Sequence, residues 1–480
     1  MYSGKKNFYF YMINNVILGI IPFISISIFS RVLTPQDYGL YALYLIIGSA
    51  FSSIVNFGLP ISHEILYFEQ KDYKHKVELT FSSIVVIIIL SLIAFIPVYL
   101  FEDLILRTIV SKNYSTNLLY LSCFSSVIFS LNFYFYNHFR NDQNGKSYMK
   151  FRALSSILTL LISIYLIIIY KLSFEAFFIS TALTSLLFLF FFILKFKIRL
   201  THVNLSIIIK SIKIALPVIP KILFGLIRVN YDRLLINNIA SQSVVGIYDL
   251  GLKASNLGTI FFQSLYNTFI PGFYDQLNKK DPGYRTAVPN FIMKSFAIYI
   301  LALLSIAFFS FEIFNVTTPK SFHAAINMSS IISVTLAFNF IEGVPLLLFL
   351  KKTNLVTLLY ISISTIILIS GVLFGLNYGI YGFLISNLIL SIISTFVYFM
   401  VYQKNLRLNW PWKKILAIYF YLLISAALII FLRINETEYL IRLIIKLFLL
   451  IGSVSIILKL KIFIMDDFRF IFNRIKLYIK

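Results

Sequence analysis

Residues Ser30–Leu43 read SRVLTPQDYGLYAL, a short polar segment between two long apolar stretches. A second segment, Asn237–Gly251, reads NNIASQSVVGIYDLG and has the same setting, because it follows one apolar stretch and leads into the next. A polar turn between apolar runs is typical of a chain that crosses a membrane, turns and crosses it again. Each segment therefore predicts a pair of membrane-spanning helices.

The composition predicts an all-α integral membrane protein. The chain has 480 residues, of which 59% are hydrophobic and 13% are charged, and its mean hydropathy is +0.88. Soluble proteins carry charge on about a quarter of their residues, and a transmembrane helix needs about 20 predominantly apolar residues. Most stretches between charge clusters reach that length. The basic N-terminus runs into an apolar segment without a small-residue cleavage site, so we expect a retained first helix.

Apolar runs and charged breaks predict about 14 transmembrane helices. They lie near residues 8–30, 37–58, 79–100, 116–138, 152–170, 174–194, 214–238, 246–270, 289–310, 326–349, 355–374, 379–402, 414–432 and 439–459. The seventh is the least typical of a membrane span, because it contains Lys221, Arg228, Asp232 and Arg233. The single cysteine, Cys123, rules out an intramolecular disulfide and a cysteine-rich metal site, and we expect no cofactor.

The distribution of Lys and Arg predicts the orientation of the chain. Most of the 42 basic residues fall in the connections on the side of the N-terminus and in the C-terminal tail. The opposite side holds Arg31, Arg107, Lys112, Lys171, Lys320 and Arg433. Cytoplasmic loops are enriched in Lys and Arg, so both termini are expected in the cytoplasm. The same loops account for most of the net charge of +23, so nucleic acid is not expected as a partner.

The two opening segments are copies of one repeat. A shift of 207 residues places Gly39-x-Tyr41 on Gly246-x-Tyr248. Six predicted helices separate the copies, so the repeats run parallel and are related by an axis along the membrane normal. This predicts two six-helix repeats around a central cavity, followed by two C-terminal helices. The expected domains are an N-terminal lobe at 1–195, a basic cytoplasmic linker at 196–213, a second lobe at 214–402, and helices 13 and 14 with a basic tail at 403–480.

The first segment resembles a family signature. SRVLTPQDYGLYAL is similar to the S-R-x-L-x-P-x-x-Y-G-x-Y pattern of Wzx-type bacterial polysaccharide flippases, which export O-antigen and capsule repeat units. Arg31, Pro35 and Gly39 stand at matching positions. Thr34 stands where the family usually has Gly, and the turn tolerates this if Thr34 does not need a positive φ.

The second half resembles the same family. Residues 215–255, ALPVIPKILFGLIRVNYDRLLINNIASQSVVGIYDLGLKAS, show a Pro-led helix, an Asp-Arg pair and a V-G-x-Y turn that includes Gly246 and Tyr248. LNYGIYGFLIS at Leu376–Ser386 is similar to the family's G-I-x-G turn before the twelfth helix.

The resemblance implies membership of the multidrug/oligosaccharidyl-lipid/polysaccharide exporter superfamily, with two six-helix lobes around a central cavity. It also implies translocation of undecaprenyl-pyrophosphate-linked oligosaccharides across the bacterial cytoplasmic membrane by alternating access. The two additional helices would help to receive the lipid tail. A polysaccharide polymerase machinery is a candidate partner, and the pathway would be the biosynthesis of a surface polysaccharide such as lipopolysaccharide or capsule.

Charged residues inside predicted spans are candidate functional residues, because each costs a few kcal/mol at the centre of the bilayer. Arg228 and Asp232 are four residues apart on the seventh helix, so they share a face and can pair. Arg228, Asp232, Arg233 and Lys253 are the candidate substrate-binding charges, since a pyrophosphate leaving water needs inward-facing cations and Arg donates to phosphate bidentately. The alternative is that Asp232 only neutralises a neighbouring arginine so that the helix can insert.

A coupling ion, Na⁺ or H⁺, needs a titratable group inside the membrane. Asp249 and Glu342 are the candidates. Lys221, Lys294 and Lys446 are expected to extend toward the membrane surface instead. No single aromatic residue stands out as a sugar-binding candidate from the sequence.

Two other classes of membrane protein are alternatives. A membrane glycan polymerase or ligase needs a catalytic constellation on the extracytoplasmic side, and the predicted loops there are short, so an enzyme is not expected. A sister exporter, either a peptidoglycan lipid-precursor flippase or a multidrug extruder, stays as the alternative. Multidrug extruders of the superfamily usually have twelve helices, whereas the peptidoglycan flippase resembles this chain in helix number. The S-R-x-L-x-P signature and the Asp-Arg pair of the seventh helix favour the polysaccharide flippases.

Overall fold

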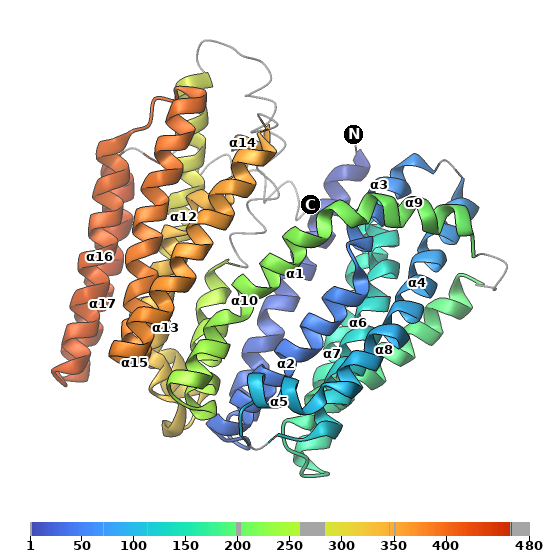
Figure 1. Ribbon diagram of the computed structural model, residues 1–480. Coiled ribbons are helices and arrows are strands. Elements are labelled where there is room, and N and C mark those ends of the chain that lie inside the picture. The colour runs from blue at the N-terminus through green and yellow to red at the C-terminus, as the bar shows by residue number, and fades with distance from the viewer. Residues whose placement is uncertain are drawn as a thin grey trace. The chain divides into compact units, whose positions relative to one another are not determined.

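The computed structural model describes residues 2–70, 72–112, 114–197, 203–259, 284–344, 346–349, 352–460 and 462. These residues form helices and connections without any strand, which confirms the all-α prediction (Figure 1). The chain divides into two compact units. The first comprises Met1–Leu250 with Thr317–Phe322, and the second comprises Gly251–Val316 with His323–Lys480.

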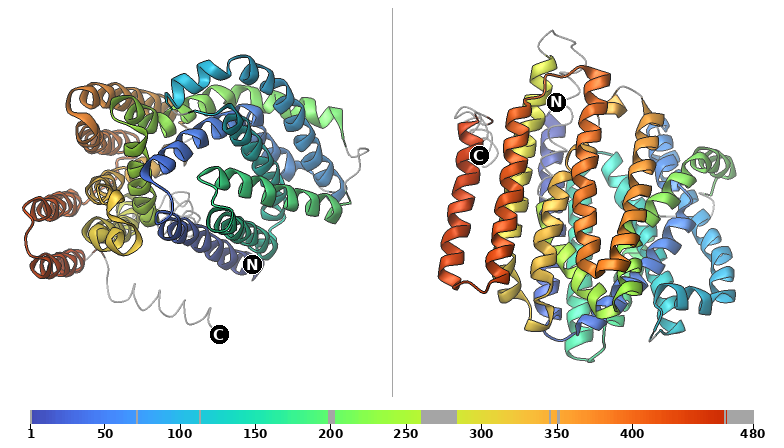
Figure 2. Two further views of the ribbon diagram at one scale, coloured as in Figure 1. Left: turned by 90° about the horizontal axis from the view of Figure 1, so that it is seen from below. Right: turned by 60° about the vertical axis from the view of Figure 1, so that its left-hand side comes forward.

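The first unit is a bundle of long helices. Its helices are α1 (Tyr2–Phe29), α2 (Pro35–Asn56), α3 (Leu59–Glu69), α4 (Tyr73–Leu100), α5 (Glu102–Ile109), α6 (Thr116–Asn141), α7 (Gly145–Ile168), α8 (Glu175–Lys195), α9 (Leu205–Ala215) and α10 (Ile219–Ile239). A further helix covers 242–259, and its first part belongs to this unit. Helix α1 packs on α7, α2 packs on α6, and α8 packs on both α6 and α7. Figure 2 (left) views these helices, coloured blue to green, from one end.

The polar segment after α1 begins the next helix through local interactions. Thr34 is the N-cap of α2, and Asp37 accepts hydrogen bonds from the Thr34 amide at 2.8 Å and hydroxyl at 2.7 Å, while the Asp37 amide donates to Thr34 Oγ1 at 3.2 Å. This reciprocal capping satisfies donors that a helix start leaves free, and Pro35 suits the first helical position because it has no amide hydrogen to lose. Thr34 has φ −79°, so the family's usual glycine is not required here.

Three short helices in this unit were missed in the sequence. Helices α3, α5 and α9 have 11, 8 and 11 residues, which is too short to cross a bilayer. Helix α3 follows a turn in which Phe57 and Gly58 have φ values of 48° and 74°, and it packs on α9. Residues 205–213 of the expected linker are therefore helical and packed on the N-terminal helices.

The second unit contains the remaining spans. Its helices are α12 (Tyr284–Thr317), α13 (Ala325–Phe338), α14 (Leu346–Phe349), α15 (Thr353–Leu406), α16 (Trp412–Ile434) and α17 (Tyr439–Lys459). The segment α15 contains a break at Gly379, where φ is 64° and ψ is −156°, so it comprises two helices as predicted. The expected tenth helix, 326–349, is interrupted after Phe338 and continues through a 3₁₀ turn at Ile341–Gly343.

The number of long apolar helices confirms a multi-pass membrane protein. Among the described residues, nine helices are long and apolar enough to cross a membrane, and one of them is the double helix α15. Two shorter apolar stretches, Ile13–Phe29 and Ala325–Phe338, lie in α1 and α13. Helix α10 is not among the nine, in keeping with the charges noted in its sequence. The predicted eighth helix, 246–270, lies partly outside the described residues.

Candidate translocation site

The charged residues of α10 pair with the helix over 242–259. Arg233 donates from Nε and Nη2 to Asp249 Oδ1, at 2.8 Å and 2.7 Å. One residue earlier on each helix, Tyr248 donates from its hydroxyl to Asp232 Oδ2 at 2.6 Å. Four of the predicted site residues thus form two adjacent pairs, and each pair is separated by 16 residues in sequence.

The hairpin geometry explains these partners. The chain reverses between α10 and 242–259, so the two helices lie side by side and bring side chains 16 residues apart in sequence within reach of each other. The Arg233–Asp249 pair is well shielded, with side-chain exposures of 16% and 4%. Removing two charges from water costs several kcal/mol each, and this cost is offset only by close, well-directed hydrogen bonds of the kind seen here. The charges of Arg233 and Asp249 accordingly neutralise each other.

The other predicted charges occupy separate places. Arg228 lies on α10 about one turn from Asp232 and is half-buried. Lys253 lies in the helix over 242–259 and Glu342 lies in the 3₁₀ turn after α13, and both are half-buried. The sequence predicted that Glu342 lies inside a continuous helix. In the structure this helix is interrupted after Phe338, so Glu342 lies in a turn.

The family-signature residues meet at the start of α2 and of the helix over 242–259. A Cβ on Gly39 would overlap the backbone of Gln242, and a Cβ on Gly246 would overlap Pro35 O and lie 2.7 Å from Gly39 N. Only glycine allows two backbones to approach so closely. Arg31 lies outside this contact, on the exposed turn after α1.

A cavity of about 560 Å³ lies within the first unit, between α2, α6 and α8. Its lining is mostly apolar with a scatter of hydroxyl and amide groups, and none of the described residues that line it is charged. The hydroxyl and amide groups come from Ser49, Ser52, Ser53, Asn56, Ser125, Ser126, Ser130 and Thr181. The aromatic rings come from Tyr41, Phe129, Phe133, Phe177 and Phe178. Leu45, Gly58, Pro60 and Ile222 complete the lining.

Several hydroxyls of the cavity already donate their proton to their own helix. Ser49 donates to Ile46 O at 3.0 Å, Ser130 to Val127 O at 2.8 Å, and Thr181 to Phe177 O at 2.7 Å. Each hydroxyl oxygen then offers lone pairs as an acceptor. A cavity that combines such acceptors with exposed ring faces suits a ligand with many hydroxyl groups and apolar C–H faces.

This cavity was not predicted, because the candidate residues were chosen by their charge. The available signal was the clustering of serines at 49, 52 and 53 and at 125, 126 and 130, in two spans that prove to be neighbours. Small hydroxyl residues also mediate close helix packing in membranes, so their clustering does not by itself indicate a cavity. The pairing of α2 with α6 was required to place them on one wall.

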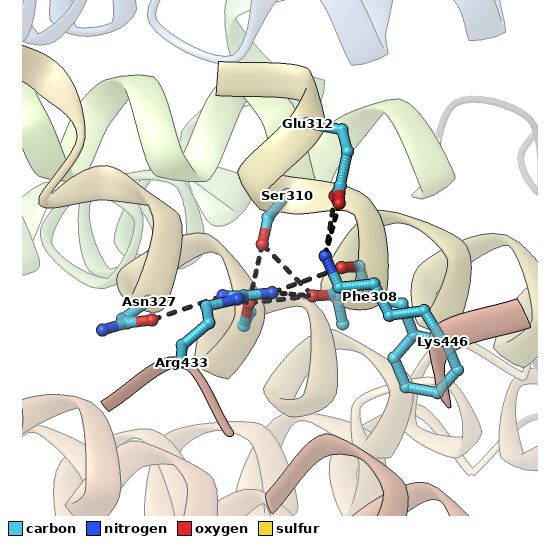
Figure 3. A network of polar contacts seen from close by, with 8 residues as sticks. Phe308, Ser310, Glu312, Asn327, Arg433 and Lys446 are labelled. Atoms are coloured by element: carbon cyan, nitrogen blue, oxygen red, sulfur yellow. Dashed lines mark hydrogen bonds and ion pairs between the residues drawn. The ribbon is translucent and has the colours of Figure 1, made fainter. Parts of the chain in front are cut away.

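The second unit holds a buried polar network at one end of α12, α13, α16 and α17 (Figure 3). Arg433 of α16 donates to Ser330 Oγ at 2.9 Å, to Asn327 Oδ1 at 3.3 Å and to the carbonyl oxygens of Ala307 and Phe308 at 2.9 Å and 3.3 Å. These bonds tie the end of α16 to α12 and α13.

Lys446 of α17 belongs to the same region. Its Nζ lies 2.6 Å and 2.8 Å from the carboxylate oxygens of Glu312 on α12, and its side chain is 2% exposed. The expectation that Lys446 extends to the membrane surface is therefore wrong, because a carboxylate within the bundle provides a closer partner. Both C-terminal helices are thus joined by buried polar contacts to the preceding helices of their unit.

The geometry and the comparisons together define the class of protein. The chain is a multi-pass membrane protein with the fold of solved flippases and multidrug transporters. It belongs to the polysaccharide biosynthesis protein family, whose model matches residues 5–276. No curated protein matches it in sequence.

Solved transporters share its fold. A structure described as the lipid II flippase MurJ in an inward closed conformation matches with a TM-score of 0.62 at 15% identity, over 94% of this chain and 98% of that one. A mutant of the Vibrio cholerae MATE transporter VcmN matches with a TM-score of 0.54 at 15% identity, over 85% of this chain and 98% of that one. An outward-facing multidrug resistance transporter of the MATE family matches with a TM-score of 0.55 at 14% identity, over 84% of this chain and 95% of that one. At these identities the likeness concerns the fold.

Proposed function

We propose that this protein is a flippase for lipid-linked oligosaccharides, which moves undecaprenyl-pyrophosphate-linked repeat units across the bacterial cytoplasmic membrane during surface polysaccharide biosynthesis. The observation that carries the proposal is the uncharged cavity of the first unit, with its hydroxyl acceptors and aromatic faces, in a chain of the polysaccharide biosynthesis family. Sugars are recognised by hydrogen bonds to their hydroxyls and by stacking of their C–H faces on rings. The cavity supplies both kinds of contact.

The glycan and the pyrophosphate would contact different groups. The glycan occupies the cavity, and Arg228, Arg233 and Lys253 are the cations proposed for the pyrophosphate. Helix α10 links the two regions, because Ile222 lines the cavity and Arg228 lies further along the same helix. Arg228 lies near the middle of α10 and Arg233 nearer its end, so Arg228 is the stronger candidate of the two arginines for phosphate contact.

The topology of the proposal follows the distribution of basic residues. Both termini lie in the cytoplasm, and the two lobes alternate between inward-open and outward-open states around the substrate. A coupling Na⁺ or H⁺ at Asp249 or Glu342, and contact with a polysaccharide polymerase, remain proposals derived from the sequence. O-antigen and capsule units are the candidate cargoes.

The test is the leaflet accessibility of the lipid-linked repeat unit in cells that lack this protein. We expect the unit to accumulate, unpolymerised, on the cytoplasmic face, and wild-type protein to clear it. Complementation with Arg228→Ala should fail while the protein inserts normally, whereas Lys413→Ala, at an exposed position at the start of α16, should complement fully.

Two results would contradict the proposal. Accumulation of the unit on the periplasmic face would identify the missing step as polymerisation or ligation. Normal polysaccharide with accumulation of the peptidoglycan precursor, or with sensitivity to drugs, would identify a sister exporter.

A further inference from the structure

Two buried histidines lie close together at one end of the first unit. His63 of α3 and His138 of α6 contact the same side chain, Thr80 of α4: His63 Nε2 lies 3.2 Å and His138 Nδ1 lies 3.4 Å from Thr80 Oγ1. All three side chains are buried. Asp142, the C-cap of α6, lies beyond His138 and is partly exposed, with its Oδ2 3.5 Å from His138 Nε2. This cluster has no place in the proposed binding of glycan or pyrophosphate.

The hydroxyl of Thr80 determines the tautomer of both rings. Its single proton is donated to the carbonyl oxygen of Lys76 at 2.9 Å. Thr80 Oγ1 can therefore only accept from the two histidines, so His63 carries its hydrogen on Nε2 and His138 carries one on Nδ1. In a neutral His138 the lone pair is then on Nε2, the atom that faces Asp142.

In a neutral His138, Nε2 is a hydrogen-bond acceptor that faces a second acceptor, the carboxylate of Asp142. The Nε2 lone pair faces a carboxylate oxygen at 3.5 Å, an unfavourable arrangement. When a proton binds Nε2, the ring becomes a cation and forms an ion pair with the carboxylate oxygen at 3.5 Å. Burial opposes the charge on the ring, and the carboxylate favours it.

Charged and titratable side chains surround the histidines on every neighbouring helix. These are Glu64 and Tyr67 from α3, Tyr73 and Lys76 from α4, Tyr134 and Arg140 from α6, and Lys195 from α8. Lys76 binds Asp142 at 2.7 Å and Arg140 binds Glu64 at 3.0 Å, so these four charges cancel in two pairs. A proton on His138 would therefore add a positive charge beyond these two pairs, next to the cation of Lys195 near Phe139.

His63 is not suited to take that proton. Burial, followed by the nearby charges of His138 and Arg140, lowers the pKa of His63 to about 3. Its Nδ1 has no hydrogen-bond partner among the described residues. His63 instead acts as a neutral donor that holds Thr80 in place.

We propose that His138 and Asp142 form a proton-binding site of the N-terminal helices, oriented by Thr80 and His63, and that a proton from water binds there to His138 Nε2. The bound proton gives an imidazolium paired with the Asp142 carboxylate. This site differs from Asp249 and Glu342, the groups that the sequence indicated for a coupling ion. It rests on the contacts around His138 and does not require the proposed flippase function.

The proton site is close to the cavity of the first unit. Tyr134 lies one helical turn before His138 on α6, packs its ring 5.3 Å from that of His63, and donates from its hydroxyl to Asn56 Oδ1 at 3.1 Å. Asn56 lines the cavity, as does Phe133 beside Tyr134. Charging His138 therefore acts on a wall of the cavity through a continuous set of contacts.

The experiment is a pH titration of the full-length protein in lipid nanodiscs, with ¹³C at Cε1 of its five histidines. Single His→Gln variants assign the signals. We expect the His138 signal to move through one transition as the pH is lowered, and to do so at a higher pH than the His63 signal, because only His138 faces a carboxylate. In the Asp142→Asn protein, the proton affinity of His138 should fall about tenfold or more, because an opposite charge at this distance changes such an equilibrium by that order.

The chain contains a matched control at its surface. His75 Nδ1 lies 3.5 Å from Asp72 Oδ2, the same separation as in the buried pair, but the side chains are 49% and 76% exposed. Asp72→Asn is therefore the control variant: it removes an exposed, solvent-screened carboxylate and should leave the His138 transition unchanged. The proposal is overturned if His138 titrates at no higher pH than His63, or if Asp142→Asn changes the His138 transition no more than Asp72→Asn does.

A second measurement tests the link to the cavity. A fluorophore on Ser53→Cys, in a chain whose single native cysteine is changed by Cys123→Ser, would report on the cavity wall. Its emission should change with the same midpoint as His138 and lose that change in Asp142→Asn. If the emission of the fluorophore does not change with pH while His138 titrates, the charge of His138 does not affect the cavity wall.

Discussion

Gly39 and Gly246 lie backbone to backbone, so that a Cβ on Gly246 would come within 2.7 Å of Gly39 N and would overlap Pro35 O. The two glycines are the equivalent positions of the sequence repeat. The repeat therefore encodes a contact between its own two copies: the start of α2 packs on the start of the helix over 242–259. A side chain at either glycine would force these helix starts apart.

Gly246→Ala should destabilise the protein by about 1–3 kcal/mol, the cost typical of added volume in a packed site. Thermal unfolding of the purified protein measures it. Gly225→Ala is the control, since a Cβ there meets nothing within 4 Å and α10 is helical at that position. Replacing a mid-helix glycine by alanine stabilises a helix by up to about 1 kcal/mol. Equal melting temperatures for the two variants would contradict the close approach.

The ion pair between Arg233 and Asp249 should behave non-additively. Arg233→Ala or Asp249→Ala alone leaves a shielded charge without its partner and should cost about 3–5 kcal/mol, whereas the double variant should recover much of that loss. Unfolding of the four proteins forms a double-mutant cycle. A double variant that loses the sum of the single losses would show that the two side chains do not stabilise each other.

The aromatic faces of the cavity should contribute to binding. Phe129→Ala should weaken binding of the extracted lipid-linked repeat unit about fivefold, which corresponds to about 1 kcal/mol for one ring contact. Calorimetric titration of the purified protein measures this. Phe190→Ala is the control, because Phe190 is 64% exposed on α8 and does not line the cavity. If both variants bind as wild type does, the glycan does not occupy this cavity.

The buried His63 predicts a loss of stability in acid. Its pKa is lowered to about 3, mainly by burial, from an unfolded-state value near 6.5. Between these values the unfolded chain binds the extra proton, so stability is constant above about pH 6.5 and falls as the pH decreases below it. At pH 5 this effect of His63 lowers the free energy of unfolding by about 2 kcal/mol relative to its value above about pH 6.5.

The His63→Gln variant isolates this contribution. Its melting temperature should fall less than that of wild type between pH 7.5 and pH 5, although its stability at pH 7.5 is lower because the contact with Thr80 changes. Parallel curves for the two proteins would show that His63 does not carry the acid sensitivity.

Features set by local interactions and by hydropathy were predictable from the sequence. The apolar spans, the membrane class and the helix start at Pro35 follow from composition and from neighbouring residues, because a membrane helix satisfies its own backbone and a cap involves positions three residues apart. Gly379 likewise separates the eleventh and twelfth predicted helices through its positive φ. The short helices α3, α5 and α9 were not predicted, because hydropathy detects only segments long enough to span the membrane.

Features that depend on which helices are neighbours required the tertiary structure. The sequence offered Arg228 as a partner of Asp232, at a spacing of four residues, but could not show that the hairpin brings Tyr248 to Asp232 and Asp249 to Arg233. The serine-lined cavity and the contact of His63 and His138 with Thr80 arise in the same way, from helices distant in sequence. The sequence by itself determined which segments enter the membrane, since that depends on transfer from water. The tertiary structure decided which polar groups meet there, since a buried group must find its partner across helices.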